Sequence, residues 1–243
     1  MFSFIKNNNI SPKSLIFVKQ AISHIVSDAD VDFDDEVILD SSFLTTKAYC
    51  VYNELKRTNG NLFRRTIGSF IDYPEYKLYF RVGNCDDPAD MCTNDDYLIS
   101  SNILTIKVDN VNLNGLNNAA ALLHEGIHAE LFRFVNEANN GNVNPNERER
   151  LFDLYRIYKD DLRNLNSNAQ HAYMAENYVE PIAKAIRELD NNRYPLEYYM
   201  GFGWDGLRDY AYTGLLSDED SARFEELKNI VLDNTNFNPI NCN

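Results

Sequence analysis

The pattern of apolar and polar positions divides the chain into a first part with mixed periodicity and a second part with helical periodicity. Before residue 110, two segments alternate and are rich in aromatic and β-branched residues, 76–82 (YKLYFRV) and 102–108 (NILTIKV), which predicts two strands. From residue 117 onward, apolar residues recur every three to four positions, which predicts helices. These helices are expected at 117–139, 146–164, 169–189, 202–215 and 218–234.

The first part also contains segments with helical spacing. We expect helices at 12–26, 43–58 and 62–71 and an extended segment at 36–40 (EVILD). A small sheet followed by a helical bundle predicts the α+β fold class. At 243 residues the chain has room for one domain with an extension. We place the extension, partly helical, at 1–33 and the domain at 34–243, with the sheet up to about residue 110 and the helical part at 117–234.

Composition narrows the range of partners and locations. The formal net charge of −14 argues against binding to nucleic acid, which needs clustered Lys and Arg. The acidic runs 27–36 and 217–226 fit solvated faces and helix starts better than calcium loops. No apolar run approaches the roughly 18 residues of a membrane span, and the N-terminus lacks a conventional signal peptide. We therefore expect a chain that is cytoplasmic, exported by a non-classical route, or cut from a longer polypeptide.

The cysteines do not point to a metal site of their own. The chain has 4 cysteines and no CxxC pair, which argues against a zinc knuckle or a thioredoxin-type site. Cys85 and Cys92 flank a turn-rich loop, DDPADM. Their spacing fits a disulfide and two free thiols equally well.

Residues 124–128 read HEGIH and lie in the helix expected at 117–139. His124 and His128 are four residues apart, so both imidazoles lie on one side of the helix and can bind one metal ion. Glu125 points about 100° away around the helix, beside the metal rather than among its ligands. A general base that takes a proton from metal-bound water belongs in this position. The pattern His-Glu-x-x-His is therefore typical of a metal-dependent hydrolase with Glu125 as its catalytic residue.

A catalytic zinc ion usually has three protein ligands and one open position, so one ligand remains to be found. His171, Glu176 and Glu180 are the candidates in the helix expected at 169–189. At about 100° per residue, His171 points from the middle of the apolar arc of this helix, whereas Glu176 and Glu180 lie about 140° and about 180° away. The apolar residues that share the arc with His171 are Met174, Ala175, Tyr178, Ile182, Ala185, Ile186 and Leu189.

An inward-facing histidine is a better zinc ligand than two outward carboxylates. The alternative for His171 is a core histidine bonded to its neighbours, and Pro181 weakens the phase argument for the second half of the helix. The fourth histidine, His24, is remote in the sequence. The simplest interpretation is that His124, His128 and His171 bind one Zn²⁺ per chain.

Three longer segments share their pattern with a known group of proteins. They read LLHEGIHAEL, QHAYMAENYVEPIAKAIRELD and YYMGFGWDGLRDYAYTGLLSDED, and DDEVILDSSFLTTKAYCVYNEL adds a looser match. Over residues 34–234 the chain resembles bacterial domains that are identified by motif as zinc metallopeptidases. Such domains occur as small proteins and at the C-termini of large Rhs-like, polymorphic-toxin polypeptides.

This resemblance has implications for fold, site and role. It implies a zincin-like fold, in which a small sheet lies beside the metal-binding helix and later helices close the site. The element Gln-His-x-x-Met-Ala recurs in the group and matches Gln170, His171, Met174 and Ala175, which supports His171 as the third ligand. The resemblance also implies hydrolysis of a protein or peptide substrate and a role as a secreted or delivered effector or toxin.

The leading hypothesis is thus a zinc metallopeptidase in which Glu125 activates a zinc-bound water. The alternatives are a core helix without a metal and a non-catalytic binding or structural module whose metal stabilises the fold. Gly126 costs about 1 kcal/mol relative to alanine inside a helix, and we expect it to leave room beside the metal. Ordinary packing is the favoured interpretation for Tyr173 and Tyr178 and for the aromatic segment 198–216, which we expect to pack near the metal-binding helices.

Overall fold

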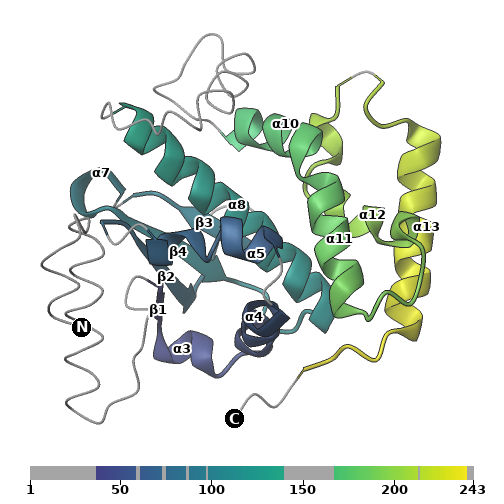
Figure 1. The fold of residues 1–243 in the computed structure, drawn as a ribbon, viewed down its shortest axis with the longest axis horizontal. Helices are drawn as coiled ribbons and strands as arrows, with labels where there is room; N and C mark the ends of the chain where they lie inside the picture. Colours follow the sequence, from purple (N-terminus) through teal and green to yellow (C-terminus); the bar gives the residue numbers. More distant parts are fainter. Residues whose placement is uncertain are drawn as a thin grey trace, which may run out of the picture. The chain divides into compact units, whose positions relative to one another are not determined.

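The computed structural model describes residues 37–58, 61–72, 75–85, 88–96, 98–139, 167–212 and 214–239. The chain divides into two compact units, 1–35 and 36–243, and every described residue belongs to the second. The helices expected at 12–26 and 146–164 lie outside the described residues, as does the extension expected at 1–33. The described part of the second unit is an α+β structure, as predicted, with one small sheet and a larger set of helices (Figure 1).

The sheet has four strands in the order β1-β2-β4-β3. They are β1 (Val37–Leu39), β2 (Lys77–Val82), β3 (Met91–Asn94) and β4 (Ile103–Val108). The first three strands in this order are mutually parallel, and β3 runs antiparallel to β4 at one edge. The strands expected at 76–82 and 102–108 are confirmed as β2 and β4, and the extended segment at 36–40 contains β1. The sequence pattern does not predict β3, because only Met91 of its residues is buried and no alternation results.

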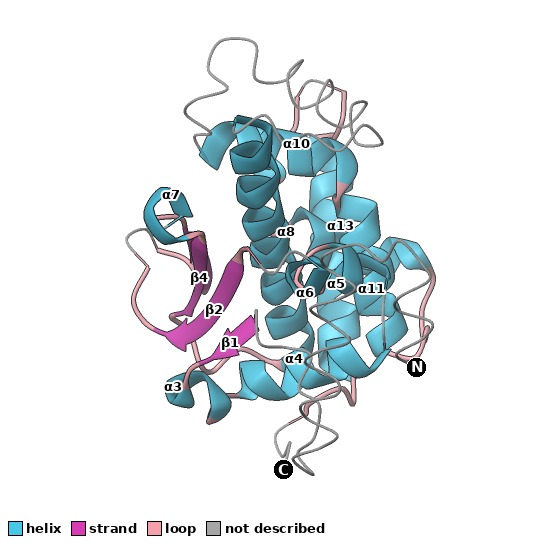
Figure 2. Ribbon diagram, turned by 60° about the vertical axis from the view of Figure 1, so that its left-hand side comes forward, coloured by secondary structure: helices cyan, strands magenta, loops and turns pink. Residues whose placement is uncertain are grey.

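One face of the sheet forms the core with the long helix α8 (Gly115–Asn139). The inward residues of β2 and β4 are fully buried, and they are Leu78, Phe80, Leu104, Ile106 and Val108. Helix α4 (Lys47–Thr58) packs against α8. In both ribbon views α8 lies between the sheet and the later helices (Figures 1 and 2). The helix expected at 117–139 is confirmed as α8, so the HEGIH motif lies at the centre of the unit.

The helix expected at 169–189 is two helices, α10 (Ser167–Asn177) and α11 (Val179–Leu189). They are separated at Tyr178, whose φ of −121° departs from helical geometry. Pro181 accounts for the break, because in a continuous helix its ring would clash with the carbonyl of Asn177. In the observed structure Pro181 lies in the first turn of α11, where the missing N–H has no helical acceptor.

The single helix expected at 202–215 is wrong. The segment contains the end of α12 (Met200–Trp204) and a 3-10 turn, η3 (Arg208–Tyr210), and α12 is preceded by η2 (Leu196–Tyr199). Asp205 is extended and Gly206 has a φ of 75°, so the helix ends at Trp204. The first part of the aromatic segment is core as predicted, since Tyr199, Phe202 and Trp204 are buried, whereas Tyr212 is exposed.

Shorter breaks divide the helices expected at 43–58 and 62–71. The observed elements are α3 (Ser41–Leu44), α4, α5 (Asn61–Arg65) and α6 (Ser69–Asp72), and a further short helix, α7 (Leu98–Ser101), precedes β4. The last helix, α13 (Asp218–Asn234), confirms the prediction for 218–234. Ser217 caps it by accepting a hydrogen bond from the Asp220 N–H, so the second acidic run is a helix start.

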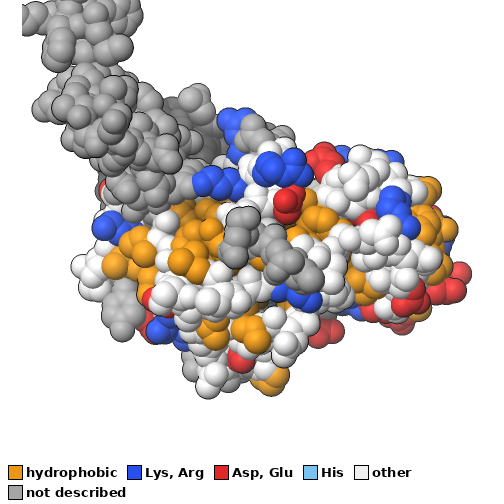
Figure 3. All heavy atoms as spheres, turned by 90° about the horizontal axis from the view of Figure 1, so that it is seen from below, with side chains coloured by type: hydrophobic (Ala, Val, Ile, Leu, Met, Phe, Trp, Pro, Cys, Tyr) orange, Lys and Arg blue, Asp and Glu red, His pale blue; other side chains and the backbone are white. Residues whose placement is uncertain are grey.

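The charged side chains of this unit are distributed unevenly. Figure 3 shows one face on which basic side chains are scattered among hydrophobic and polar ones. Several acidic side chains lie toward its right-hand edge, the side on which Figure 1 places α13. Among the described residues, no helix combines the length and the apolar character that crossing a membrane requires.

Candidate metal centre

The structure brings together the three histidines that the sequence singles out. His124 and His128 lie one turn apart on α8, and His171 comes from the second turn of α10. The Nε2 atom of His128 lies 3.1 Å from Nε2 of His124 and 3.0 Å from Nε2 of His171. All three imidazoles therefore present the same nitrogen to one point.

This triangle of nitrogens fits a divalent metal ion. Zinc–nitrogen bonds of about 2.0–2.1 Å at tetrahedral angles place ligand atoms about 3.3 Å apart, close to the 3.0 and 3.1 Å observed. Within the described ranges, these three histidines are the one group of His, Cys, Asp or Glu side chains close enough to share an ion. Among the described residues, no fourth side chain of these types joins them.

Gln170 fixes the orientation of His128. The Oε1 atom of Gln170 lies 2.5 Å from Nδ1 of His128, and both side chains are buried. An amide oxygen can only accept, so the ring proton must be on Nδ1, which leaves the lone pair of Nε2 for a metal. Adjacent residues of α10 thus provide one candidate ligand, His171, and the group that orients a second candidate, His128. Among the described residues, the Nε2 atom of Gln170 is buried without a hydrogen-bond partner.

Burial keeps the three imidazoles neutral. It lowers the pKa of His124 well below 6.5, with repulsion from His128 and His171 acting in the same direction. Burial, followed by repulsion from His171, lowers the pKa of His128 to about 4. The pKa of His171 is lowered by burial alone. Neutral imidazoles are the form that binds metals, so each ring can offer a nitrogen lone pair.

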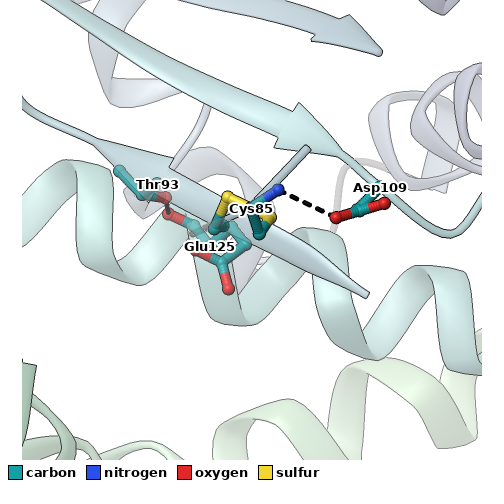
Figure 4. Close-up of a disulfide and its surroundings, with 5 residues drawn as sticks. Cys85, Thr93, Asp109 and Glu125 are labelled. Carbon is teal, nitrogen blue, oxygen red and sulfur yellow. Dashed lines mark hydrogen bonds between the residues drawn. A yellow bond between two sulfur atoms is a disulfide. The ribbon is translucent and has the colours of Figure 1, made fainter. Parts of the chain in front are cut away.

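Glu125 lies beside the histidines and under β3. It is 8% exposed, and burial raises the pKa of its carboxyl to about 8, while hydrogen bonds from Thr93 act in the opposite direction. The Thr93 hydroxyl also donates to the backbone carbonyl of Glu125 at 2.9 Å. Figure 4 shows Thr93 next to Glu125, where β3 crosses α8. Strand β3 therefore helps to hold the candidate base.

Gly126 does not have the role expected from the sequence. A Cβ atom at this position would lie 2.7 Å from Cγ1 of Ile67, on the side of α8 that packs against the segment after α5. The glycine is needed for close packing of α8 against Ile67 and does not line the cavity beside the histidines. The expectation that it leaves room for the metal is therefore wrong.

A cavity of about 840 Å³ opens over the histidines. One wall is formed by residues 88–93, which include most of β3, and the opposite wall by Phe202, Asp205, Gly206, Tyr210 and Lys228. Cys85 and Cys92 form a disulfide, which resolves the alternative that their spacing left open. The bond joins the residues just before the first wall to β3. Next to this disulfide, the Cys85 N–H donates to Asp109 at 2.8 Å (Figure 4).

Glu176 and Glu180, the two glutamates that the helical periodicity places on the outward face, lie outside this cavity. Glu180 is exposed and forms an ion pair with Lys184 at 2.6 Å, and Glu176 does not line the cavity. Tyr173 and Tyr178 pack against each other with ring centroids 6.0 Å apart and do not line it either. Of the residues weighed as third ligand, His171 lines the cavity and Glu176 and Glu180 do not.

Sequence reasoning missed Thr93, Asp205, Tyr210 and Lys228. Tyr210 packs its ring on that of His171, with centroids 4.6 Å apart. None of the four carried a local signal, because each reaches the cavity only through tertiary packing. The aromatic pattern of 198–216 placed that segment near the site but did not distinguish Tyr210 from its neighbours.

The described residues thus define an α+β protein with a three-histidine site of the kind that binds a metal ion. No family model, no curated protein and no solved structure matches the chain. Its function is therefore inferred from the residues of the site.

Proposed function

We propose that the protein is a zincin-like metallopeptidase that binds one zinc ion through His124, His128 and His171. The observation that carries this proposal is the position of Glu125, which follows a ligand directly and lines the same cavity as the three imidazoles. A carboxyl group in that place, beside an open metal site, has the geometry of a general base. The resemblance of the HEGIH and QHAYMA segments to bacterial metallopeptidase domains supports the same conclusion.

When bound, zinc supplies a Lewis acid that polarises a carbonyl and lowers the pKa of water towards about 7. A cation held by the three histidines would lower the pKa of the neighbouring Glu125 carboxyl, and the resulting carboxylate accepts a proton from the attacking water. The water oxygen bonds to the carbonyl carbon, the C–N bond breaks, and Glu125 returns the proton to the leaving amine. Gln170 keeps His128 in the tautomer that binds the metal, and Thr93 holds Glu125 from the other side.

Tyr210 is the candidate donor to the oxyanion that develops during the attack. It lines the cavity and packs on His171. Thr93 and Tyr210 are the hydroxyl-bearing residues of the lining, and the Thr93 hydroxyl already donates to a backbone carbonyl. A hydroxyl group aimed at the reacting carbonyl is one of the groups that stabilise such a charge.

The edge strand β3 supports a peptide as the substrate. It pairs with β4 on one side, and in the described part of the chain no strand pairs with its other side. Met91, Cys92 and Thr93 of this strand line the cavity. An extended peptide that added itself to this edge would lie across the histidines, with its backbone N–H and C=O groups paired to β3.

Metal content and the variant Glu125→Gln test the proposal. Purified protein should contain about one zinc ion per chain, and Glu125→Gln should keep the metal while losing hydrolysis of a peptide library. Glu180→Gln, a change of the same kind on the exposed face of α11, is the control and should remain active. Folded protein that takes up no zinc, or an active Glu125→Gln variant, would contradict the proposal.

A further inference from the structure

Residues 205–210, called here the ligand-contacting segment, touch two of the three histidines. The backbone of Gly206 lies against His124, since a Cβ atom there would be 3.2 Å from Cε1 of that ring. Its φ of 75° also disfavours any other residue. At the other end, the ring of Tyr210 lies 4.6 Å from that of His171, at an interplanar angle of 35°. One short segment thus contacts a ligand on α8 and a ligand on α10.

Ion pairs attach this segment to α13. Asp205 accepts a hydrogen bond from the Lys228 ammonium at 2.8 Å, and Arg208 pairs with Glu225. Members of the two pairs also approach each other, since Arg208 lies 3.9 Å from Asp205 and Lys228 lies 3.7 Å from Glu225. The four charges therefore alternate in sign. Besides this cluster, the buried Leu207 and the packing of η3 against α10 connect the segment to the rest of the described unit.

Lys228 is placed differently from an ordinary surface lysine. Its side chain is 10% exposed, and its ammonium lies 5.7 Å from the centre of the Phe202 ring. Both Lys228 and Asp205 line the cavity over the histidines. A nearly buried ammonium is stabilised by its ion-pair partner, so removal of Lys228 or Asp205 breaks the 2.8 Å contact and leaves the Arg208–Glu225 ion pair as the remaining one between the segment and α13.

We propose that the Asp205–Lys228 pair positions His124 and His171 for metal binding by holding the ligand-contacting segment against both imidazoles. Lys228 acts through the segment and is a positioning residue. The inference rests on the proposed metal site and is independent of whether the protein cleaves peptides.

The experiment measures zinc affinity of the full chain by competition with a chromophoric chelator, and the visible absorption bands of the cobalt-loaded protein. Lys228→Met keeps the aliphatic stem and removes the charge, and we expect zinc affinity to fall about tenfold, in the range seen for groups that orient metal ligands. The cobalt bands should shift because the geometry of two ligands changes. Lys184→Met removes a lysine from the exposed pair with Glu180 and should change neither measurement.

A second variant keeps the test decisive if Lys228→Met does not fold. Asp205→Asn should weaken zinc binding to a similar degree, and the double variant should be no weaker than the single variants because both changes break one pair. Unchanged zinc affinity and cobalt bands in either folded variant would overturn the inference, as would an equal loss in Lys184→Met. Zinc binding without peptide cleavage would remove the proposed activity but leave this test intact. Failure of the unaltered chain to bind zinc or cobalt would remove both.

Discussion

Replacement of Gln170 by methionine is the most informative change at the candidate metal centre. Gln170 is fully buried, and its Oε1 accepts the Nδ1 proton of His128 at 2.5 Å. Methionine has a similar length and no strong acceptor, so the variant removes this hydrogen bond and retains most of the packing.

The expected loss of zinc affinity follows from the two states of His128. With metal on Nε2, the ring proton must remain on Nδ1 and would be buried without an acceptor. Without metal, the proton can move to Nε2, which lies 3.0 Å from Nε2 of His171, and the penalty disappears. An unsatisfied buried donor costs about 1–3 kcal/mol. At about 1.4 kcal/mol per factor of ten, zinc affinity should fall about 5- to 150-fold.

Stability should respond in a different way. The Nε2 atom of Gln170 is buried without a partner, and methionine removes that donor. We therefore expect the free energy of unfolding of the metal-free variant, measured by urea denaturation, to be no lower than that of the unaltered protein. Asn118→Leu replaces a fully buried amide that lies on α8 away from the cavity, and it should leave zinc affinity unchanged. Zinc affinity within twofold of the unaltered value in folded Gln170→Met would refute the reasoning.

Three further predictions concern other parts of the molecule. Tyr210→Phe keeps the ring on His171, so zinc affinity should be retained while kcat falls about 100- to 1,000-fold if the hydroxyl stabilises the oxyanion; an unchanged kcat would exclude that role. The Cys85→Ala/Cys92→Ala variant opens a loop of sequence separation 7 and should lose about 2–3 kcal/mol of unfolding free energy in urea, whereas an unchanged value would show that the loop is held by other contacts. Hydrogen bonds, first from Ser42 and second from Tyr79, lower the pKa of Asp40 from 3.8 to about 2. This carboxylate therefore stabilises the fold above its unfolded pKa, and the stabilisation is lost as pH falls from about 4 to about 2. Tyr79→Phe should raise the pKa of Asp40 in an NMR titration, and no change would mean that the hydroxyl does not contribute.

Local patterns predicted the elements whose own residues determine them. The strands at 76–82 and 102–108 alternate because one face of each is buried, and α8 has a continuous helical pattern. Strand β3 depends on pairing with β4 and so leaves little trace in the sequence. The break between α10 and α11 follows from Pro181, and the end of α12 follows from Gly206; in both regions the apolar periodicity continued past a local conformation that stops the helix.

The same distinction applies to the candidate site. The spacing of His124 and His128 is a local property of one helix, and the inward direction of His171 follows from the phase of another. The role of Gln170 could not be predicted from its own helix, because its amide contacts the ring of His128, which lies about 40 residues earlier in the chain. Lys228 reaches the cavity from α13, and nothing in its own neighbourhood marks it, because the helix around it is acidic and partly exposed.

The two walls of the cavity are held by different interactions, and this difference predicts separate kinetic effects. The Cys85–Cys92 disulfide holds the wall that contains β3, where we propose that a peptide pairs, while the Asp205–Lys228 pair attaches to α13 the wall that contacts His124 and His171. Reduction of the disulfide should therefore raise KM for a peptide more than it lowers zinc affinity, because the three histidines lie on helices that the disulfide does not join. Assays of the zinc-loaded protein with and without a non-chelating phosphine reductant measure this. A loss of zinc on reduction, with KM unchanged, would show that β3 supports the metal site rather than the substrate.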